Sequence, residues 1–425
     1  MKVLLISHNC FSTYQNMGKT FLSLFSGFEK DEICQLYIYP TLPDVDVCSS
    51  YYRVTDKDVL DSLLKFKKPG GEIDKSKIVS AKKNLFEKDE DAKLYKKPGK
   101  KEPMKRLLRD MMWSLSHWYT KELEAWLDRE APTAIFLSPG YAKFIYDIAL
   151  KISKKLNIPI VTYICDDYYF VNTPSSLTGK IQLRLLQKKT DKLMKKTSHL
   201  ITICDDIKDM YGEKFGVSAS AIMTGTSYKM ADTVKVAESP TEICYFGNIS
   251  CNRHISLAEI GKALDILNAE RGKNYALKIY TGEKKPEVLA IFDGIKSVQL
   301  CGFISGKEFE DTLHASDILL HTEAFDDKSI DLVKHSVSTK IADSLASGIT
   351  LFAYGPCSVA SMKHLIKHGA AITCTASEGL KDALLTAFED PESRERAAEN
   401  GLKTAAQLHD SQVNGQKVRG IFSEL

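Results

Sequence analysis

A short segment in the last quarter of the chain combines groups that can bind a phosphate and a sugar. It reads S-T-K-I-A-D from Ser338 to Asp343, and Gly348 and an apolar run follow it. Ser338 or Thr339 can cap a helix here, which leaves the other first-turn N–H groups and the positive end of the helix dipole to an anion. Lys340 adds a full positive charge, and Asp343 can accept hydroxyl protons one turn later. Phosphate beside sugar hydroxyls describes a nucleotide; the alternative is an ordinary capped surface helix.

Two loops carry further groups that suit a diphosphate. Gly18 stands before an apolar helix in S-T-Y-Q-N-M-G-K-T, where the backbone could approach the ligand closely. A P-loop would have another glycine five residues earlier, but Thr13 stands there, so we do not predict an NTPase of that class. The loop G-N-I-S-C-N-R-H offers Gly247, Asn248 and Arg253. Arg253 could hold a diphosphate with two hydrogen bonds, although a solvated loop arginine is the alternative.

Other polar groups follow apolar runs that read as strands. The run Y-I-C-D-D ends in Asp166 and Asp167, which could bind sugar hydroxyls or act as a base, or could cap the following turn. His8 follows the first such run and is a further candidate, although a structural histidine is the commoner case. The remaining groups should line one wall of a site: Thr281, Gly282, Gly302, Phe303, Ile304, His321, Thr322 and Glu323.

Short apolar strands alternate with longer amphipathic helices along the whole chain, which is the α/β pattern of parallel sheets covered on both faces. At 425 residues the chain is too long for a single core. We predict two Rossmann-like, doubly wound domains that face a cleft, at 1–226 and 242–405, with a polar connection between them and a helical tail at 406–425. Ligands of such sheets bind at the carboxyl ends of the strands.

The composition is that of a soluble globular protein, with 44% hydrophobic and 27% charged residues. The net charge of +3 predicts no nucleic-acid partner. Ten cysteines show neither a C-x-x-C pair nor a Cys/His cluster, and there is no D-x-D motif, so we predict reduced thiols and neither a metal nor a cofactor. No signal peptide or membrane span is recognisable, which indicates a cytoplasmic protein.

One segment differs in charge from the rest of the chain. Residues 65–109 contain 16 Lys or Arg against 7 Asp or Glu, inside what we predict to be an insertion at about 58–109. Such a patch could meet an anionic membrane surface at the inner leaflet, because basic residues gain about 1 kcal/mol each near it. The alternative is a flexible lysine-rich insertion without a partner.

The second half of the chain resembles GT-B glycosyltransferases of the retaining, nucleotide-sugar-dependent class, of the family 4-like type found in bacterial capsule, exopolysaccharide and lipopolysaccharide assembly. The matching segments are Y-F-G-N-I-S, I-Y-T-G-E, L-C-G-F-I-S-G-K-E-F-E-D-T-L-H-A-S-D-I-L-L-H-T-E-A-F and S-T-K-I-A-D-S-L-A-S-G-I-T-L-F-A-Y-G-P. The resemblance implies that the last segment holds the donor diphosphate and ribose and that the G-F-I turn touches the nucleobase. It also implies hexosyl transfer to a glycan or lipid-linked acceptor bound by the first domain, with the leaving diphosphate as the base.

The chain departs from that family at one motif. Family members commonly carry two glutamates eight positions apart, whereas this chain has His335 and Asp343 at those places. Asp343 can still accept ribose hydroxyls, but His335 cannot be given a glutamate's role, and Glu323 could reach in from the preceding strand. Two other functions stay open: a nucleotide-sugar epimerase of the same architecture, which normally needs several acids and histidines, and a catalytically idle nucleotide-sugar-binding subunit of an assembly complex.

Overall fold

The computed structural model describes residues 1–13, 15–78, 102–226 and 228–425, and their contacts divide the chain into two units. The first unit contains Met1–Met223 and Asn414–Leu425, and the second contains Thr224–Val413. The predicted tail therefore does not stand alone: the last helix packs in the first unit. The predicted insertion at about 58–109 is described only up to residue 78 and again from residue 102.

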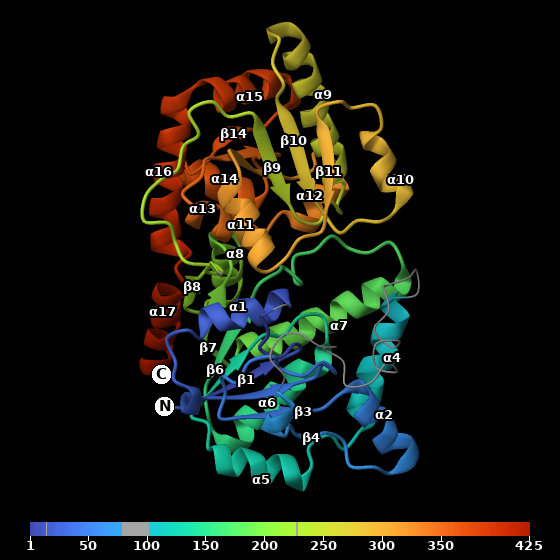
Figure 1. Ribbon diagram of the computed structural model, residues 1–425. Coiled ribbons are helices and arrows are strands. Elements are labelled where there is room, and N and C mark those ends of the chain that lie inside the picture. Colours follow the sequence, from blue (N-terminus) through green and yellow to red (C-terminus); the bar gives the residue numbers. More distant parts are fainter. Residues whose placement is uncertain (14, 79–101, 227) are drawn as a thin grey trace. The chain divides into compact units, whose positions relative to one another are not determined.

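An eight-stranded sheet forms the centre of the first unit (Figure 1). Its order is β4-β3-β2-β1-β5-β6-β7-β8, and every neighbouring pair is parallel except β3 and β4. The strands are β1 Val3–Ser7, β2 Ile33–Tyr37, β3 Ser50–Arg53, β4 Gly71–Glu72, β5 Ala134–Leu137, β6 Ile160–Ile164, β7 Thr197–Thr202 and β8 Ala219–Ala221.

Helices cover both faces of this sheet, which explains why β1 is apolar without alternation. Val3 and Leu5 belong to one buried cluster, and Leu4 and Ile6 belong to another, because successive side chains point to opposite faces. The helices are α1 Asn16–Leu24, α2 Asp56–Lys65, α4 Glu102–Leu115, α5 Lys121–Glu130, α6 Lys143–Leu156, α7 Leu177–Met194, α8 Asp205–Phe215 and α17 Ser411–Ser423, with 3-10 turns at η1 Lys30–Glu32 and η2 Lys75–Lys77.

The second unit has a six-stranded, fully parallel sheet with the order β11-β10-β9-β12-β13-β14. Its strands are β9 Glu242–Phe246, β10 Ala276–Tyr280, β11 Val298–Gly302, β12 Ile318–Thr322, β13 Leu351–Tyr354 and β14 Ile372–Cys374. The helices are α9 Arg253–Arg271, α10 Pro286–Leu289, α11 Lys307–Ala315, α12 Asp327–Val333, α13 Thr339–Ala346, α14 Ala360–His368, α15 Leu380–Glu389 and α16 Pro391–Leu408, with 3-10 turns at η3 Ala290–Phe292 and η4 Ser377–Gly379.

The polar stretch before β9 is not a loose connection, because it is bonded to the end of α13. The backbone N–H of Ala231 donates to the carbonyl of Ala346, and that of Lys235 donates to Gly348, both at 2.8 Å. Gly348 has a φ of +71°, and a Cβ there would lie 2.7 Å from the carbonyl oxygen of Thr233. A side chain at position 348 would therefore disturb both the helix end and this packing.

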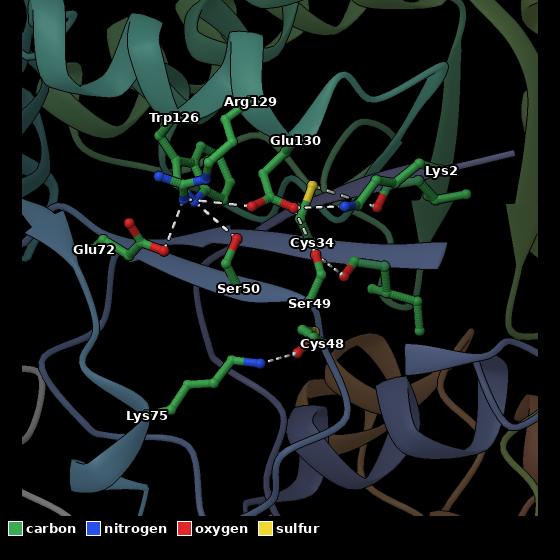
Figure 2. Close-up of polar contacts among 12 residues, drawn as sticks. Lys2, Cys34, Cys48, Ser49, Ser50, Glu72, Lys75, Trp126, Arg129 and Glu130 are labelled. Carbon is green, nitrogen blue, oxygen red and sulfur yellow. Dashed lines mark hydrogen bonds and ion pairs between the residues drawn. The ribbon is translucent and has the colours of Figure 1, made fainter. Parts of the chain in front are cut away.

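A polar cluster joins the amino ends of the first sheet's strands to the end of α5 (Figure 2). Glu130 is buried and accepts from Ser49 Oγ at 2.6 Å, and its other close partner is Lys2 Nζ at 2.6 Å. Trp126 Nε1 donates to Ser50 Oγ at 2.8 Å. Burial opposes the charged form of Glu130, but the bonds from Lys2, Ser49 and Ser50 outweigh it and hold its pKa at about 2.

In the part of the chain that the structure describes, no helix is both long enough and apolar enough to cross a membrane.

Candidate functional site

Each sheet has one place where its strand order reverses, and the candidate residues gather there. In the second sheet the chain leaves β9 toward β10 on one side and later occupies β12 on the other. Gly247 follows β9, and Glu323 follows β12. In the first sheet the corresponding strands are β1 and β5, and His8 and Ser138 follow them. The carboxyl ends of such strands form the ligand-binding crevice of doubly wound sheets.

Lys340 passes directly over the end of β9. A Cβ on Gly247, whose φ is +143°, would lie 2.7 Å from Cε of Lys340 and 3.1 Å from its Nζ. Glycine is therefore needed at position 247 for the lysine to lie there. Lys340 is exposed and belongs to the first turn of α13. The structure thus brings together two residues that are 93 positions apart in the sequence and that were both predicted to bind the donor.

The start of α13 lies where the sequence predicted it, but the predicted side-chain cap at Ser338 is wrong. Ser338 occupies the N-cap position in an extended conformation, and its side chain makes no capping hydrogen bond within the described residues. Its carbonyl accepts from the N–H of Ile341 at 3.0 Å. Lys340 belongs to this first turn, where the positive end of the helix dipole lies.

Arg253 is held by Glu323. The Nε and Nη2 atoms of Arg253 donate to the two carboxylate oxygens of Glu323 at 2.9 and 3.0 Å, and the Glu323 side chain is only 2% exposed. Glu323 therefore neutralises the arginine that we expected to hold a diphosphate. The predicted bidentate bracing is thus made to a carboxylate of the protein, and any contact of Arg253 with a ligand must use its remaining N–H groups.

His321 lies beside this pair, with its Nε2 atom 3.6 Å from Oε1 of Glu323. Burial lowers the pKa of His321 to about 4; Glu323 acts in the opposite direction, while Arg253 and Lys340 lower it further. The imidazole is therefore neutral at pH 7, and its buried Nε2 has no hydrogen-bond partner within the described ranges. His335 lies between α12 and α13, outside both helices.

Asp343 and Asn248 both have partners inside the second unit. One oxygen of Asp343 accepts from Thr226 Oγ1 at 2.9 Å. The side chain of Asn248 accepts from the N–H of Ser250 at 2.7 Å, and its carbonyl accepts from Tyr245 Oη at 2.7 Å. Asn248 therefore shapes the loop after β9, whereas Asp343 is bonded to the first residues of the second unit.

The ends of β10 and β11 present an aromatic surface. Phe303 is 73% exposed, and a Cβ on Gly282 would lie 3.5 Å from its ring. Thr281 is buried and accepts from the N–H of Glu283 at 3.3 Å, while Ile304 is half-buried. An exposed ring over a glycine can stack with a flat ligand such as a nucleobase.

Gly18 belongs to the first unit and packs against its own loop. A Cβ on Gly18 would lie 2.5 Å from the backbone nitrogen of Ser12 and 2.6 Å from its Cβ. The residue is buried inside α1 rather than placed before it. Close packing of the chain therefore accounts for this glycine, and its predicted contact with a diphosphate stays a prediction.

The two neighbouring aspartates after β6 have different environments. Asp167 accepts from the N–H groups of Tyr169 and Phe170 at 2.9 and 3.0 Å and from Tyr211 Oη at 2.9 Å, so it caps the turn, which was the alternative reading. Asp166 instead lines a cavity and accepts from Tyr168 Oη at 3.2 Å. Burial raises the pKa of Asp166, although the bond from Tyr168 opposes this.

This cavity is the feature that sequence reasoning missed. It has a volume of about 480 Å³ and lies at the switch point of the first sheet. His8, Ser138 and Asp166 line it from the ends of β1, β5 and β6, and Asp56 lines it from α2 after β3. Helix α4 closes it with the side chains of Lys105, Arg106, Arg109 and Asp110. Only the strand order brings these groups together, since they come from segments up to 158 residues apart.

Comparison with protein-family models and with curated protein sequences gives no match. Solved structures do match. The chain is similar to Anabaena HepE in complex with UDP and glucose, at 12% identity and a TM-score of 0.63, over 100% of both chains. It is similar to sucrose-phosphate synthase from Thermosynechococcus elongatus, at 10% identity and a TM-score of 0.58, over 100% of this chain and 99% of that one.

A third structure agrees with these two. The trehalose-phosphate synthase of Burkholderia xenovorans in complex with glucose-6-phosphate matches at 8% identity and a TM-score of 0.56, over 100% of this chain and 99% of that one. At identities this low, the matches show only that the fold is shared. With its two Rossmann-like parallel sheets, the chain has the GT-B fold of nucleotide-sugar glycosyltransferases, which confirms the fold class predicted from the sequence.

Proposed function

We propose that the protein is a glycosyltransferase that moves a sugar from a nucleotide-diphosphate-sugar to an acceptor. The observation that carries this proposal is the placement of Lys340 over Gly247, at the uncapped start of α13 and at the switch point of the second sheet. A lysine beside the start of a helix suits a diphosphate, because the first-turn N–H groups and the positive end of the dipole attract anions. The solved structure of HepE with UDP-glucose supports a nucleotide-sugar donor of this kind.

The other donor contacts follow from the positions of the surrounding side chains. Phe303 offers its exposed ring to the nucleobase, and Asp343 offers its carboxylate to the ribose. Lys340 and the start of α13 offset the diphosphate charge, so the proposal requires neither a metal nor another cofactor. The transferred group is proposed to be a hexosyl residue.

The acceptor side is proposed to lie in the first unit, where Asp166 faces the cavity. Asp166 would bind an acceptor hydroxyl, and Asp167 would hold the turn that positions it. We take the leaving diphosphate as the base and expect retention at the anomeric carbon, in cell-surface polysaccharide synthesis on a glycan or lipid-linked acceptor. NMR of the first-formed product would show an inverted anomer if retention is wrong.

Helix α4 and the end of α2 support peripheral association of a cytoplasmic protein with an anionic membrane. Four large apolar side chains of α4 recur at helical spacing and are about half exposed or more: Met104, Leu108, Met111 and Leu115. On the α2 side, Leu64 is 68% and Phe66 is 92% exposed, next to the basic residues Lys65, Lys67 and Lys68. Apolar side chains beside lysines suit an anionic interface.

Vesicle co-sedimentation tests the membrane proposal. Binding to anionic vesicles should fall at high salt and should weaken in a Leu108→Gln, Met111→Gln double variant. Ile266→Gln is the matched control, because Ile266 is an exposed apolar residue of α9 in the second unit. Equal recovery with neutral and anionic vesicles would rule the proposal out.

A thermal-shift panel of UDP- and GDP-sugars tests the catalytic proposal. A ligand at 100 times its dissociation constant should raise the unfolding free energy by about 2.7 kcal/mol. Incubation of the binding donor with candidate acceptors then separates the possible outcomes: a transferred sugar supports the proposal, an isomerised donor indicates an epimerase, and binding alone indicates an idle subunit. No response to any nucleotide-sugar would contradict a donor site.

A further inference from the structure

The cavity of the first unit is closed by the polar face of α4. Lys105, Arg106, Arg109 and Asp110 line it, and Trp113 on the same side of the helix is buried. At about 100° per residue these positions lie opposite the apolar stripe of Met104, Leu108, Met111 and Leu115. One face of α4 therefore lines the cavity, while the opposite face is exposed.

Arg109 is fixed in place but not fully satisfied. Its Nε donates to Asp56 Oδ1 at 2.9 Å, and its guanidinium carbon lies 5.0 Å from the ring centroid of Phe144. Trp113 Nε1 donates to the same Asp56 oxygen at 2.7 Å, which orients the carboxylate. The Nη2 atom of Arg109 is buried and has no hydrogen-bond partner in the described part of the chain. A buried guanidinium N–H that lacks an acceptor is a place where a ligand oxygen fits.

The charge of the lining favours an anion. Asp110 is paired with Lys143, and Asp56 is paired with Arg109. Burial raises the pKa of Asp166, and the bond from Tyr168 opposes this. Lys105 and Arg106 bring further cations to the wall, and the Arg106 guanidinium lies 4.5 Å from the centre of the Tyr141 ring.

His8 adds a neutral group beside these cations. Burial lowers its pKa to about 4, and the nearby Arg109 adds to this effect while Asp56 opposes it. Its Nδ1 atom is buried and lacks a hydrogen-bond partner among the residues that the structure describes. Among the residues that the structure describes, the cavity thus contains the cationic Arg109 and the neutral His8, each with a buried polar atom that lacks a hydrogen-bond partner. It also contains the rings of Tyr141 and Tyr168, whose centroids are 4.3 Å apart.

We propose that this cavity binds the phosphate ester of the acceptor, with Arg109 and Arg106 holding the phosphate and His8 and Asp166 bonding to hydroxyls beside it. Guanidinium groups suit phosphate oxygens because their planar donors match them in pairs. The aromatic walls suit the apolar face of a sugar ring or of a lipid stem. That the bound ester is the acceptor rests on the proposed function, whereas phosphate binding in this cavity does not depend on it. The ester could be a soluble sugar phosphate or a lipid phosphate.

Calorimetric titration of the full chain tests this proposal. The probes are glucose 6-phosphate, glucose, a short isoprenyl phosphate in micelles, its alcohol in the same micelles, and inorganic phosphate. At least one ester should bind tenfold or more tightly than its unphosphorylated counterpart, and the ester that binds more tightly identifies the soluble or the lipid source. If neither ester binds better than its counterpart, the proposal is wrong.

Arginine variants locate the site. Arg109→Gln should weaken ester binding at least tenfold, and Arg106→Gln provides a second variant in case the loss of the Asp56 contact disturbs folding, which melting curves would reveal. Arg129→Gln is the matched control, because Arg129 is an exposed arginine of α5 that is paired with Glu72 of β4. Unchanged ester affinity in both cavity variants would overturn the proposal. Nucleotide-sugar affinity should be the same in all three variants as in the wild type. If the wild type binds no nucleotide-sugar, that result would count against the donor site alone.

Discussion

The two ends of the first sheet differ in whether their buried polar groups have hydrogen-bond partners within the protein. At the amino ends of the strands, Glu130 is surrounded by donors from Lys2, Ser49 and Ser50, and its charged form is stabilised (Figure 2). At the carboxyl ends, Arg109 and His8 each carry a buried polar atom without a partner within the described residues. The protein itself satisfies the buried carboxylate at one end, and at the other end these two atoms are the ones proposed to bind a ligand.

The difference shows where this fold uses polar groups for stability and where it keeps them for binding. A buried charge with all its partners resists removal, because deletion of one partner strands the others. A buried donor without a partner weakens the folded state and gains most when a ligand supplies the missing acceptor. Variants at the two ends should therefore separate stability from ligand affinity.

The largest effect is expected at the amino end. Glu130→Ala should lower the free energy of unfolding by about 3 kcal/mol, because it leaves Lys2, Ser49 and Ser50 without their shared acceptor. Urea denaturation measures this loss, and phosphate-ester affinity should not change. Arg129→Gln, on the exposed side of the same cluster, should stay within about 0.5 kcal/mol of the wild type. Equal stability of the two variants would remove the contrast.

The second unit should show the next largest effect, in binding rather than in stability. Lys340→Met should weaken nucleoside-diphosphate binding by about 2 kcal/mol, or roughly 30-fold, because it removes a charge-assisted bond. Arg253→Met should instead mainly destabilise the fold, since it strands the buried Glu323. Titration with UDP alongside melting curves separates the two results. If both variants lose only affinity, the Arg253 charge is available to the ligand after all.

A smaller change in stability is expected at the carboxyl end of the first sheet. His8→Phe should alter the free energy of unfolding by less than about 1 kcal/mol, because it removes an unsatisfied polar atom while keeping an aromatic ring beside Tyr39. Binding of the acceptor ester should weaken. A loss of stability as large as that of Glu130→Ala would show that His8 is a structural residue.

The smallest expected effects are in the pH dependence of stability, where the two ends of the sheet should act in different pH ranges. His8 has a pKa of about 4, below the ordinary 6.5, so the unfolded chain takes up a proton first and stability falls as the pH drops from about 6.5 to 4. Glu130 has a lowered pKa of about 2, so its contribution is lost only between about 4.5 and 2. His8→Phe should flatten the upper window and Glu130→Gln the lower one. His321 titrates in the upper window too, so part of that slope should remain.

The positions of several residues of the proposed donor site could be predicted from the sequence. The start of α13, Lys340 and Gly247 follow from local rules, since helix caps, lysines in first turns and glycines after strands are visible in sequence. The ion pair of Arg253 with Glu323 could not be predicted. Glu323 follows another strand, and only the strand order makes β9 and β12 neighbours. The same holds for Asp166 and Asp167, which differ only in which way each side chain points.

The sequence by itself determined the alternation of strands and helices and the two largely parallel sheets, because apolar periodicity and turn residues act over a few positions. The apolar helix predicted after Gly18 is α1, which begins at Asn16 and ends at Leu24. Only the tertiary structure decided which buried charges are neutralised and which face a cavity. Those outcomes depend on desolvation and on contacts between segments far apart in the chain, and neither is encoded in local spacing.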